Sequence, residues 1–343
     1  MPEKMIHYTP ARVNQIFEQF GLLSVMVIGD VMIDSYIWGK VSRISPEAPV
    51  PIVSVTKRAN RLGGAANVAL NLKAIGATTF LCSVIGKDDK AAVFQSLMKD
   101  NNLSAKGILE SDHRLTTTKF RIIGNNAQML RVDEEVDSAL QPADQETFFQ
   151  SIFNIIESNR VDAIIFQDYD KGVITPELIA QVVELAQLKK IPIVVDPKKR
   201  NFNHYRNVHL FKPNLKELFE GLGIASEGFS INKVQEAVRL LHEKLNVPMI
   251  FTTLSEEGVF ISHWHGDGHF DDHHIPAHLR SIADVSGAGD TVVSIACLAL
   301  ASGLSDYEIA AISNLAGGQV CESVGVVPVN RSKLMSELVS RNL

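Results

Sequence analysis

Cysteine is scarce in this sequence, and its three residues, Cys82, Cys297 and Cys321, form no Cys-x-x-Cys pair. Such a sparse, odd set is typical of a reducing compartment and excludes a disulfide scaffold. The sequence also lacks a secretory signal pattern near its start and any apolar run long enough to cross a bilayer. We therefore predict a soluble cytoplasmic protein with no membrane partner.

Blocks of positive charge are missing as well. The formal net charge is -6 and the pI is about 6.0. This balance excludes a non-specific nucleic-acid partner and an anionic membrane surface, although a local basic pocket for a small phosphate remains compatible with it. Hydrophobic residues make up 45% of the 343 positions, enough for one large α/β domain or two ordinary ones.

Several familiar catalytic motifs do not occur. No Gly-x-x-x-x-Gly-Lys stretch is present, which excludes a P-loop, and no Gly-x-Gly-x-x-Gly follows a strand, which argues against an NAD-dependent dehydrogenase. A Gly-x-Ser-x-Gly elbow, a His-Glu-x-x-His pair and a Cys/His finger spacing are also lacking. We interpret the His-rich residues 263–274 as a solvated strand-loop-strand rather than a metal site.

Short β-branched runs alternate with helical patterns along most of the chain. Strands are predicted at 25–30, 78–86, 161–168, 191–198, 208–214 and 248–255, and helices at 63–76, 90–102, 175–190 and 232–245. Thr175 and Pro176 are typical of a helix start and Gly76 of a helix end. This alternation predicts a mostly parallel sheet with helices on both faces.

Residues 35–56 and 115–133 interrupt that alternation. The first segment holds three prolines, which favours edge strands, and the second reads as a hairpin that turns at 124–126. We interpret the two as one small β-flap, the lid, over the edge of the main sheet. No repeat or linker marks a second unit, so residues 1–343 are predicted to form a single domain.

Polar residues follow the predicted strands at their carboxyl ends, where open parallel sheets bind ligands. They are Asp30, Asp34, Asp168, Asp170, Lys171, Asp196, Lys198, Asn214, Glu217, Thr252, Ser255, Asp284 and Asp290. One such acid is a common turn former. So many at one edge favour a pocket for a polar ligand.

The octamer DVSGAGDT, residues 284–291, precedes an apolar helical pattern. Backbone N–H groups of Gly287, Ala288 and Gly289 at the helix start could cradle a phosphate or a developing anion. Asp290, in the first turn, could then take a proton from an attacking hydroxyl. It could equally serve only to stabilise the helix, and the octamer alone leaves both interpretations open.

DVSGAGDT, GGAANVA at 63–69 and the two-part lid together resemble the ribokinase-like (PfkB) family of sugar kinases, over essentially the whole chain. The segments GDVMIDSYIWGKVSRISPEAPVPI, DYDKG, DPK, KPNLKE and TLSEEG are similar to the kinase domain of bacterial heptose-7-phosphate kinases. The resemblance implies a three-layer ribokinase-like fold and ATP- and Mg²⁺-dependent phosphorylation of C1 of D-glycero-D-manno-heptose 7-phosphate, for ADP-heptose and lipopolysaccharide. A kinase for another sugar or a nucleoside, or a silent sugar sensor, remains an alternative.

The resemblance also implies a role for each site residue. Asp290 would be the catalytic base beside an anion hole of Gly287, Ala288 and Gly289. The nucleotide would be bordered by Asn214, Leu215, Lys216, Glu217, Thr252, Ser255, Gly258 and Asn314, with Glu217 acting indirectly on Mg²⁺. Sugar hydroxyls would be held by Asp30, Asp34, Gly63, Gly64 and Asn67, and the substrate's phosphate by Arg131 and Lys198.

Three further expectations follow from the resemblance. Asp284 would help to bind a monovalent cation such as K⁺ beside the anion hole. The strand edges of the lid would pair with a second copy, so we expect a homodimer. Some relatives fuse a nucleotidyltransferase domain after the kinase, and we expect a separate protein to supply that step here.

Overall fold

The computed structural model describes residues 8–225, 229–266 and 268–341. Within them, one sheet has nine strands in the order β13 (Phe270–Ile275), β12 (Val259–Trp264), β11 (Met249–Thr253), β10 (Leu210–Phe211), β9 (Ile193–Asp196), β8 (Ala163–Gln167), β1 (Ser24–Gly29), β4 (Thr78–Gly86) and β5 (Gly107–Ser111). Neighbours from β11 to β5 pair in parallel, whereas β12 and β13 add antiparallel strands at one edge. The predicted, mostly parallel sheet is confirmed.

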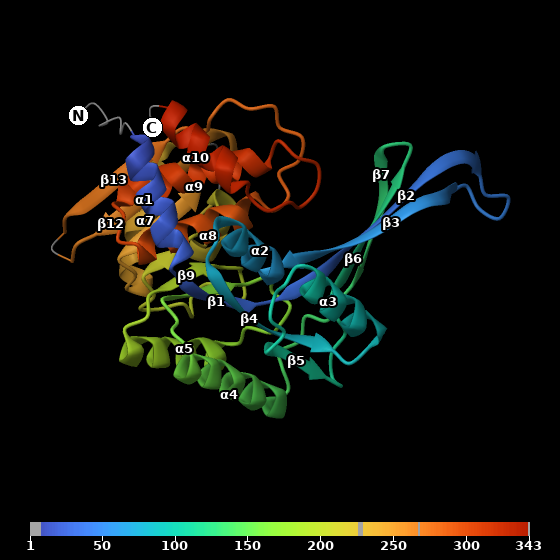
Figure 1. The fold of residues 1–343 in the computed structure, drawn as a ribbon, viewed down its shortest axis with the longest axis horizontal. Helices are drawn as coiled ribbons and strands as arrows, with labels where there is room; N and C mark the ends of the chain where they lie inside the picture. The colour runs from blue at the N-terminus through green and yellow to red at the C-terminus, as the bar shows by residue number, and fades with distance from the viewer. Residues whose placement is uncertain (1–7, 226–228, 267, 342–343) are drawn as a thin grey trace.

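Helices cover both faces of this sheet and make three layers. One face packs on α1 (Pro10–Gly21), α2 (Ala65–Ile75), α3 (Asp89–Asp100), α8 (Ala288–Ala301), α9 (Asp306–Val320) and α10 (Arg331–Ser340), and the other on α4 (Pro142–Ser158), α5 (Pro176–Lys189), α6 (Leu215–Leu222) and α7 (Ile231–Leu245). Figure 1 shows α4 and α5 across the sheet from α1 and α10. β8 and β9 are buried along their whole length, which explains their continuous apolar sequence.

Capping residues set the ends of several helices. The Thr175 hydroxyl accepts a hydrogen bond from the Leu178 N–H, and Pro176 opens α5, as predicted. Gly76 ends α2 with a φ of 113°. The predicted start of α2 is wrong, because Gly63 and Gly64 close the strand β3 (Pro51–Gly64). Gly64 has a φ of 60° and a Cβ there would collide with the Asp30 carbonyl, so only glycine allows this strand-to-helix turn.

The lid is a separate sheet, with four strands among the described residues in the order β3, β2 (Val31–Ile44), β6 (Thr118–Gly124) and β7 (Ala127–Glu134). β6 and β7 form the predicted hairpin at residues 124–127. The first hairpin is longer than the predicted 35–56, and β2 is no edge strand because it lies between β3 and β6. Figure 1 shows the lid projecting from one end of the main body. None of the described helices has the length and hydropathy needed to span a bilayer.

Candidate active site

Asp290 lies in the first turn of α8, at the carboxyl edge of the central sheet. Gly287 caps this helix with a φ of 82°, and a Cβ there would approach Asn67 Nδ2 to 2.9 Å. The turn therefore needs glycine to bring α8 against α2. Of the three amides predicted for the anion hole, that of Ala288 already donates to the Val285 carbonyl at 3.3 Å.

Three side-chain donors from other elements hold the Asp290 carboxylate. Asn67 Nδ2 donates to Oδ2 at 2.7 Å, and both Tyr169 OH (2.7 Å) and Gln167 Nε2 (3.2 Å) donate to Oδ1. The residue is only 5% exposed. A buried carboxylate with this many fixed donors has a defined orientation. A helix-stabilising acid would need none of them, so the geometry favours the interpretation of Asp290 as a base.

Burial raises the pKa of Asp290 to about 6, against the hydrogen bonds from Asn67 and Tyr169, which lower it. The nearby Asp196 raises it further and Lys212 lowers it. A general base works best when its pKa lies near the working pH. Asp290 is thus ionised at neutral pH but basic enough to accept a proton.

A buried ion pair lies beside Asp290. Lys212 Nζ is 3.1 Å from Asp196 Oδ2, and the two residues are 2% and 4% exposed. Gln167 Nε2 also donates to Asp196 Oδ2 at 3.3 Å, which joins this pair to Asp290. Gly289 faces the same pair, since a Cβ on it would lie 3.9 Å from Lys212 Nζ. The helix start and the Lys212 ammonium therefore lie close together, an arrangement that suits a bound anion.

The nucleotide residues predicted on KPNLKE surround the start of α6. Asn214 and Glu217 form a capping box, in which each side chain accepts a hydrogen bond from the other's N–H. Glu217 also pairs with Lys198. Burial lowers the pKa of Lys198, but Asp196 and Glu217 outweigh it and hold the pKa above its usual value. Leu215 and Lys216 follow in the first turn, and the Lys216 side chain is 80% exposed.

The other predicted nucleotide residues lie around the end of β11. Thr252 is fully buried, and its hydroxyl has no partner among the described residues. Ser255 begins the short 3-10 helix η1 (Ser255–Glu257). Gly258 packs against the Ile275 carbonyl, and Asn314 Nδ2 donates to the Pro276 carbonyl at 2.9 Å. Both thus contact one segment, and their role toward a nucleotide remains a prediction.

Asp30 holds the loop that carries Tyr169. Its carboxylate is 1% exposed and accepts the backbone N–H groups of Tyr169, Lys171 and Val173 at 2.9, 3.2 and 3.0 Å. Burial raises its pKa, and these bonds lower it. Asp30 therefore positions Tyr169 against Asp290, and the predicted contact with a sugar hydroxyl stays a prediction.

The lid brings a group of charged residues together at its base. Asp34 is 3% exposed, pairs with Arg121 and packs directly against Gly63. Arg131 lies opposite Arg121 across β6 and β7, so both project from the same face of the lid. Arg131 is half-exposed and pairs with Asp133 at 3.0 Å.

Asp284 joins two loops beside the start of α8. Its Oδ1 accepts the Ser286 N–H and its Oδ2 the Gly325 N–H, each at 2.9 Å. Burial raises the pKa of Asp284, but these bonds outweigh it, so the pKa lies below its usual value. Arg61 of the lid donates to the Val326 carbonyl in the second loop at 3.2 Å. The lid thereby contacts the loop that flanks Gly287.

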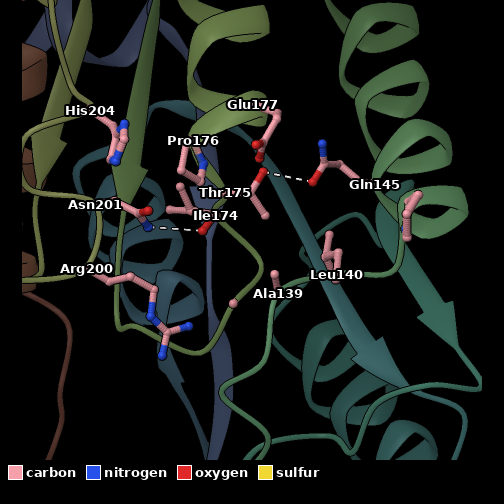
Figure 2. Close-up of a pocket in the computed structure, with 12 residues that line it drawn as sticks. Ala139, Leu140, Gln145, Ile174, Thr175, Pro176, Glu177, Arg200, Asn201 and His204 are labelled. Carbon is pink, nitrogen blue, oxygen red and sulfur yellow. Dashed lines mark hydrogen bonds between the residues drawn. The ribbon is translucent and has the colours of Figure 1, made fainter.

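A cavity of about 570 Å³ lies apart from Asp290, between the starts of α4 and α5 and residues 200–204. Figure 2 shows Thr175 donating to Gln145 and Asn201 donating to the Ile174 carbonyl, at 2.8 and 3.0 Å. Asn201 also donates to Asp168 at 3.0 Å. Burial raises the pKa of Asp168 to about 6. This cavity therefore borders the loop 168–173 from the side away from Asp290.

The sequence did not single out Gln167, Tyr169, Arg61, Arg121 or Lys212. Gln167 is a polar residue that ends an otherwise apolar strand, and Lys212 follows directly after one. A polar residue at or directly after the end of an apolar strand could therefore have identified both Gln167 and Lys212 as site candidates. Nothing local marks Tyr169, because its role depends on a contact with a residue 121 positions away.

Known proteins are similar to this chain over most of its length. The family profile of the pfkB family carbohydrate kinases matches residues 22–332. The chain is 37% identical over 327 residues to the bifunctional protein HldE of Geobacter sulfurreducens and 37% identical over 317 residues to that of Methylobacillus flagellatus. These alignments cover 95% and 92% of this chain but only 65% and 63% of the relatives. The chain thus spans just under two thirds of their length.

Solved structures show the same fold at low identity. Phosphofructokinase-2 from Escherichia coli, in complex with potassium, has a TM-score of 0.75 at 17% identity, covering 93% of this chain and all of that one. Ribokinase from Arabidopsis thaliana, complexed with ribose and ATP, has a TM-score of 0.70 at 16% identity, covering 93% and 99%. The fold is ribokinase-like, and the chain belongs to the pfkB family of carbohydrate kinases.

Proposed function

We propose that this chain transfers the terminal phosphoryl group of ATP to the C1 hydroxyl of D-glycero-D-manno-heptose 7-phosphate, toward ADP-heptose and lipopolysaccharide. The observation that carries the kinase chemistry is the buried Asp290 carboxylate, held by three donors at the start of α8. Residues 29–52 and DYDKG support the heptose through their resemblance to heptose-7-phosphate kinases. Because the reaction consumes ATP, we place the enzyme in the cytoplasm.

In the proposed mechanism the sugar's C1 oxygen attacks the terminal phosphorus while its proton passes to Asp290. The bond between phosphorus and the bridging oxygen breaks, and ADP leaves. Gly287 and Gly289 at the start of α8, together with Lys212, stabilise the negative charge on the transferring group. Asn67, Gln167 and Tyr169 keep the Asp290 carboxylate oriented toward the reacting hydroxyl.

On the side of the site proposed for the nucleotide, Glu217 could contact Mg²⁺ only indirectly. Both of its carboxylate oxygens are engaged, one by the Asn214 N–H and one by Lys198. Bound with ATP, Mg²⁺ neutralises charge on the phosphates. For a monovalent cation such as K⁺ we propose Asp284, whose carboxylate lies between the Ser286 and Gly325 loops beside the start of α8.

The face of the lid that carries Asp34 suits the sugar phosphate. Arg121 and Arg131 lie directly opposite each other. Each guanidinium has a carboxylate partner, Asp34 or Asp133. A phosphate on the sugar would add a second anion for the half-exposed Arg131, while Asp34 would accept sugar hydroxyl groups. Lys198 would contact the phosphates from the floor of the site.

The outer strands of the lid suit pairing with a second copy. β3 and β7 are its edges, and Val55 on β3 and Leu130 on β7 are exposed. Exposed edge strands with apolar residues readily add another strand. The proposed homodimer predicts twice the chain mass in light scattering behind gel filtration. A change of Leu130 to Lys should shift it to the monomer, whereas a wild-type monomer would refute the arrangement.

The deciding experiment measures ADP release with ATP, Mg²⁺ and a panel of phosphorylated sugars, and identifies the product by phosphorus NMR. A new anomeric phosphate on heptose 7-phosphate supports both the reaction and the substrate. Turnover with another sugar alone would support the kinase activity but rule out heptose 7-phosphate as the substrate. Sugar binding without turnover on any substrate would point to a sensor.

A further inference from the structure

The hairpin of β12 and β13 concentrates histidine at one corner of the molecule. His263, His265, His269, His273 and His274 are five of the chain's 11 histidines and fall within 12 residues. The structure confirms the predicted strand-loop-strand. It also shows an arrangement of side chains that the spacing alone did not indicate.

Strand alternation places these residues on a defined face. Val259 and Ile261 pack in the core layer that contains α8 and α9, whereas Phe260 packs in the opposite layer. Because side chains alternate along a strand, His263 continues the first face, and Asp271 lies opposite it on β13. His265 follows in the same alternation. A hydrogen bond from the His265 N–H to the His269 carbonyl, at 3.1 Å, fixes the two residues across the turn.

Two imidazoles converge on one carboxylate at this turn. His265 Nε2 is 2.9 Å from Asp271 Oδ2, and His269 Nε2 is 3.3 Å from Asp271 Oδ1. One ligand atom from each of the three residues lies within 4.8 Å of the others. Their side chains are 36%, 65% and 47% exposed. Solvent therefore reaches the group, and water could complete a coordination shell.

The base of the hairpin is held firmly, so the three side chains start from a defined backbone. Trp264 stacks on Phe270 with an interplanar angle of 19°. The Arg239 guanidinium lies 3.7 Å from the centre of the Phe270 ring and pairs with Asp272. These contacts belong to the face that packs on α7. His265 and Asp271 lie on the opposite face of the hairpin.

We propose that His265, His269 and Asp271 bind one divalent transition-metal ion, best Zn²⁺, with water in the remaining position. Two imidazole nitrogens and one carboxylate oxygen are the donors that Zn²⁺ favours, and three protein ligands plus water form a common tetrahedral set. Mg²⁺ fits poorly, because it prefers oxygen ligands.

This site is separate from the kinase centre. β12 runs antiparallel to β11, so His263 pairs with Met249 at the start of β11, and the turn lies at the amino edge of the parallel strands. Asp290 belongs to the opposite, carboxyl edge, where Gln167 ends β8. Metal binding and phosphoryl transfer can therefore be measured independently.

The test is a calorimetric titration of Zn²⁺ into the full chain, without a histidine tag and after treatment with a chelator. We expect one equivalent to bind, and His265→Asn or Asp271→Asn to weaken binding by about tenfold or more, since even an outer-shell partner contributes that much. His113→Asn is the matched control, because His113 is an exposed histidine outside the hairpin; it should bind as the wild type does.

Thermal unfolding supplies a second measurement. An ion that binds only the folded chain raises its melting temperature, so Zn²⁺ should stabilise the wild type and the His113→Asn variant but neither hairpin variant. Circular dichroism checks that the variants are folded. The proposal is overturned if the wild type binds no Zn²⁺, or if folded hairpin variants bind it as tightly as the wild type.

Discussion

The floor of the proposed active site and the outer strand of the lid, β7, hold their charged residues in opposite ways. On the floor, Asp290, Asp196 and Lys212 are at least 95% buried, and neighbouring side chains bond to each of them. On the lid, β7 is exposed along most of its length, and Arg131 pairs only at the surface. The floor keeps its geometry before any ligand arrives, whereas the lid offers charges that a ligand can reorganise.

We propose that this difference separates residues that carry the chemistry from residues that recognise the sugar. Groups that act on a developing charge are most effective when they are already oriented in a site that excludes water. Groups that recognise a substrate and close over it must move, and an exposed sheet attached by one end can do so. We therefore expect changes on the floor to lower kcat and changes in the lid to raise the KM for the sugar.

The strongest test of the comparison is Asp290→Asn. Loss of a general base lowers kcat by about 10²–10⁴-fold, while sugar binding measured by calorimetry should persist. Asp89→Asn is the control, because Asp89 is also a first-turn acid but lies exposed on α3; it should keep its activity. An unchanged kcat in Asp290→Asn would show that this carboxylate only stabilises α8.

Asp34→Asn should act through recognition instead. The change removes a buried charge from both Arg121 and the proposed sugar hydroxyls, and such charged hydrogen bonds correspond to about 10–100-fold in binding. Initial rates should show this as a raised KM for the sugar phosphate with kcat less affected. Asp112→Asn, in an exposed ion pair with Lys87, is the matched control. A fall in kcat alone would contradict the assignment of Asp34 to recognition.

The pH profile of kcat/KM reports the protonation of Asp290, the proposed base on the floor of the site. Since burial raises the pKa of Asp290 to about 6, the base is protonated below that pH, and kcat/KM should fall as the pH drops through 6. The hydrogen bond from Tyr169 lowers this pKa, so Tyr169→Phe should move the fall to higher pH, by about one unit or less.

Tyr8→Phe is the control for that shift, because the Tyr8 hydroxyl is buried without a hydrogen-bond partner among the described residues. This change also removes a tyrosine hydroxyl, but at a position far from Asp290 in the sequence. It should leave the pH profile of kcat/KM unchanged. If Tyr169→Phe also left it in place, the Tyr169 hydroxyl would have no part in setting the proton affinity of the base.

Arg131→Ala should have the smallest effect. The side chain is 54% exposed and its ion pair with Asp133 lies at the surface, where such pairs contribute little. We expect a rise of about two- to fivefold in the KM for the phosphorylated sugar, corresponding to less than about 1 kcal/mol, and no change in kcat. A large loss of kcat would show that the lid enters the chemistry.

Local sequence predicted those features that neighbouring residues determine. The apolar runs of β8 and β9 predicted strands, and Asn125 and Asn126 predicted the lid hairpin, since both adopt positive φ readily. The start of α2 was missed, because Gly63 and Gly64 are compatible with a helix start in isolation. Their pairing with β2 decides that they end a strand.

The sequence by itself determined the layered α/β fold and the candidates at the strand ends, because strand and helix periods and turn residues act over a few positions. Only the tertiary structure decided which candidates act together. Asn67 and Tyr169 reach Asp290 from 223 and 121 residues away. Their convergence, and the burial that raises the pKa of Asp290, arise from packing α2, α8 and the end of β8 against one another, which no local pattern encodes.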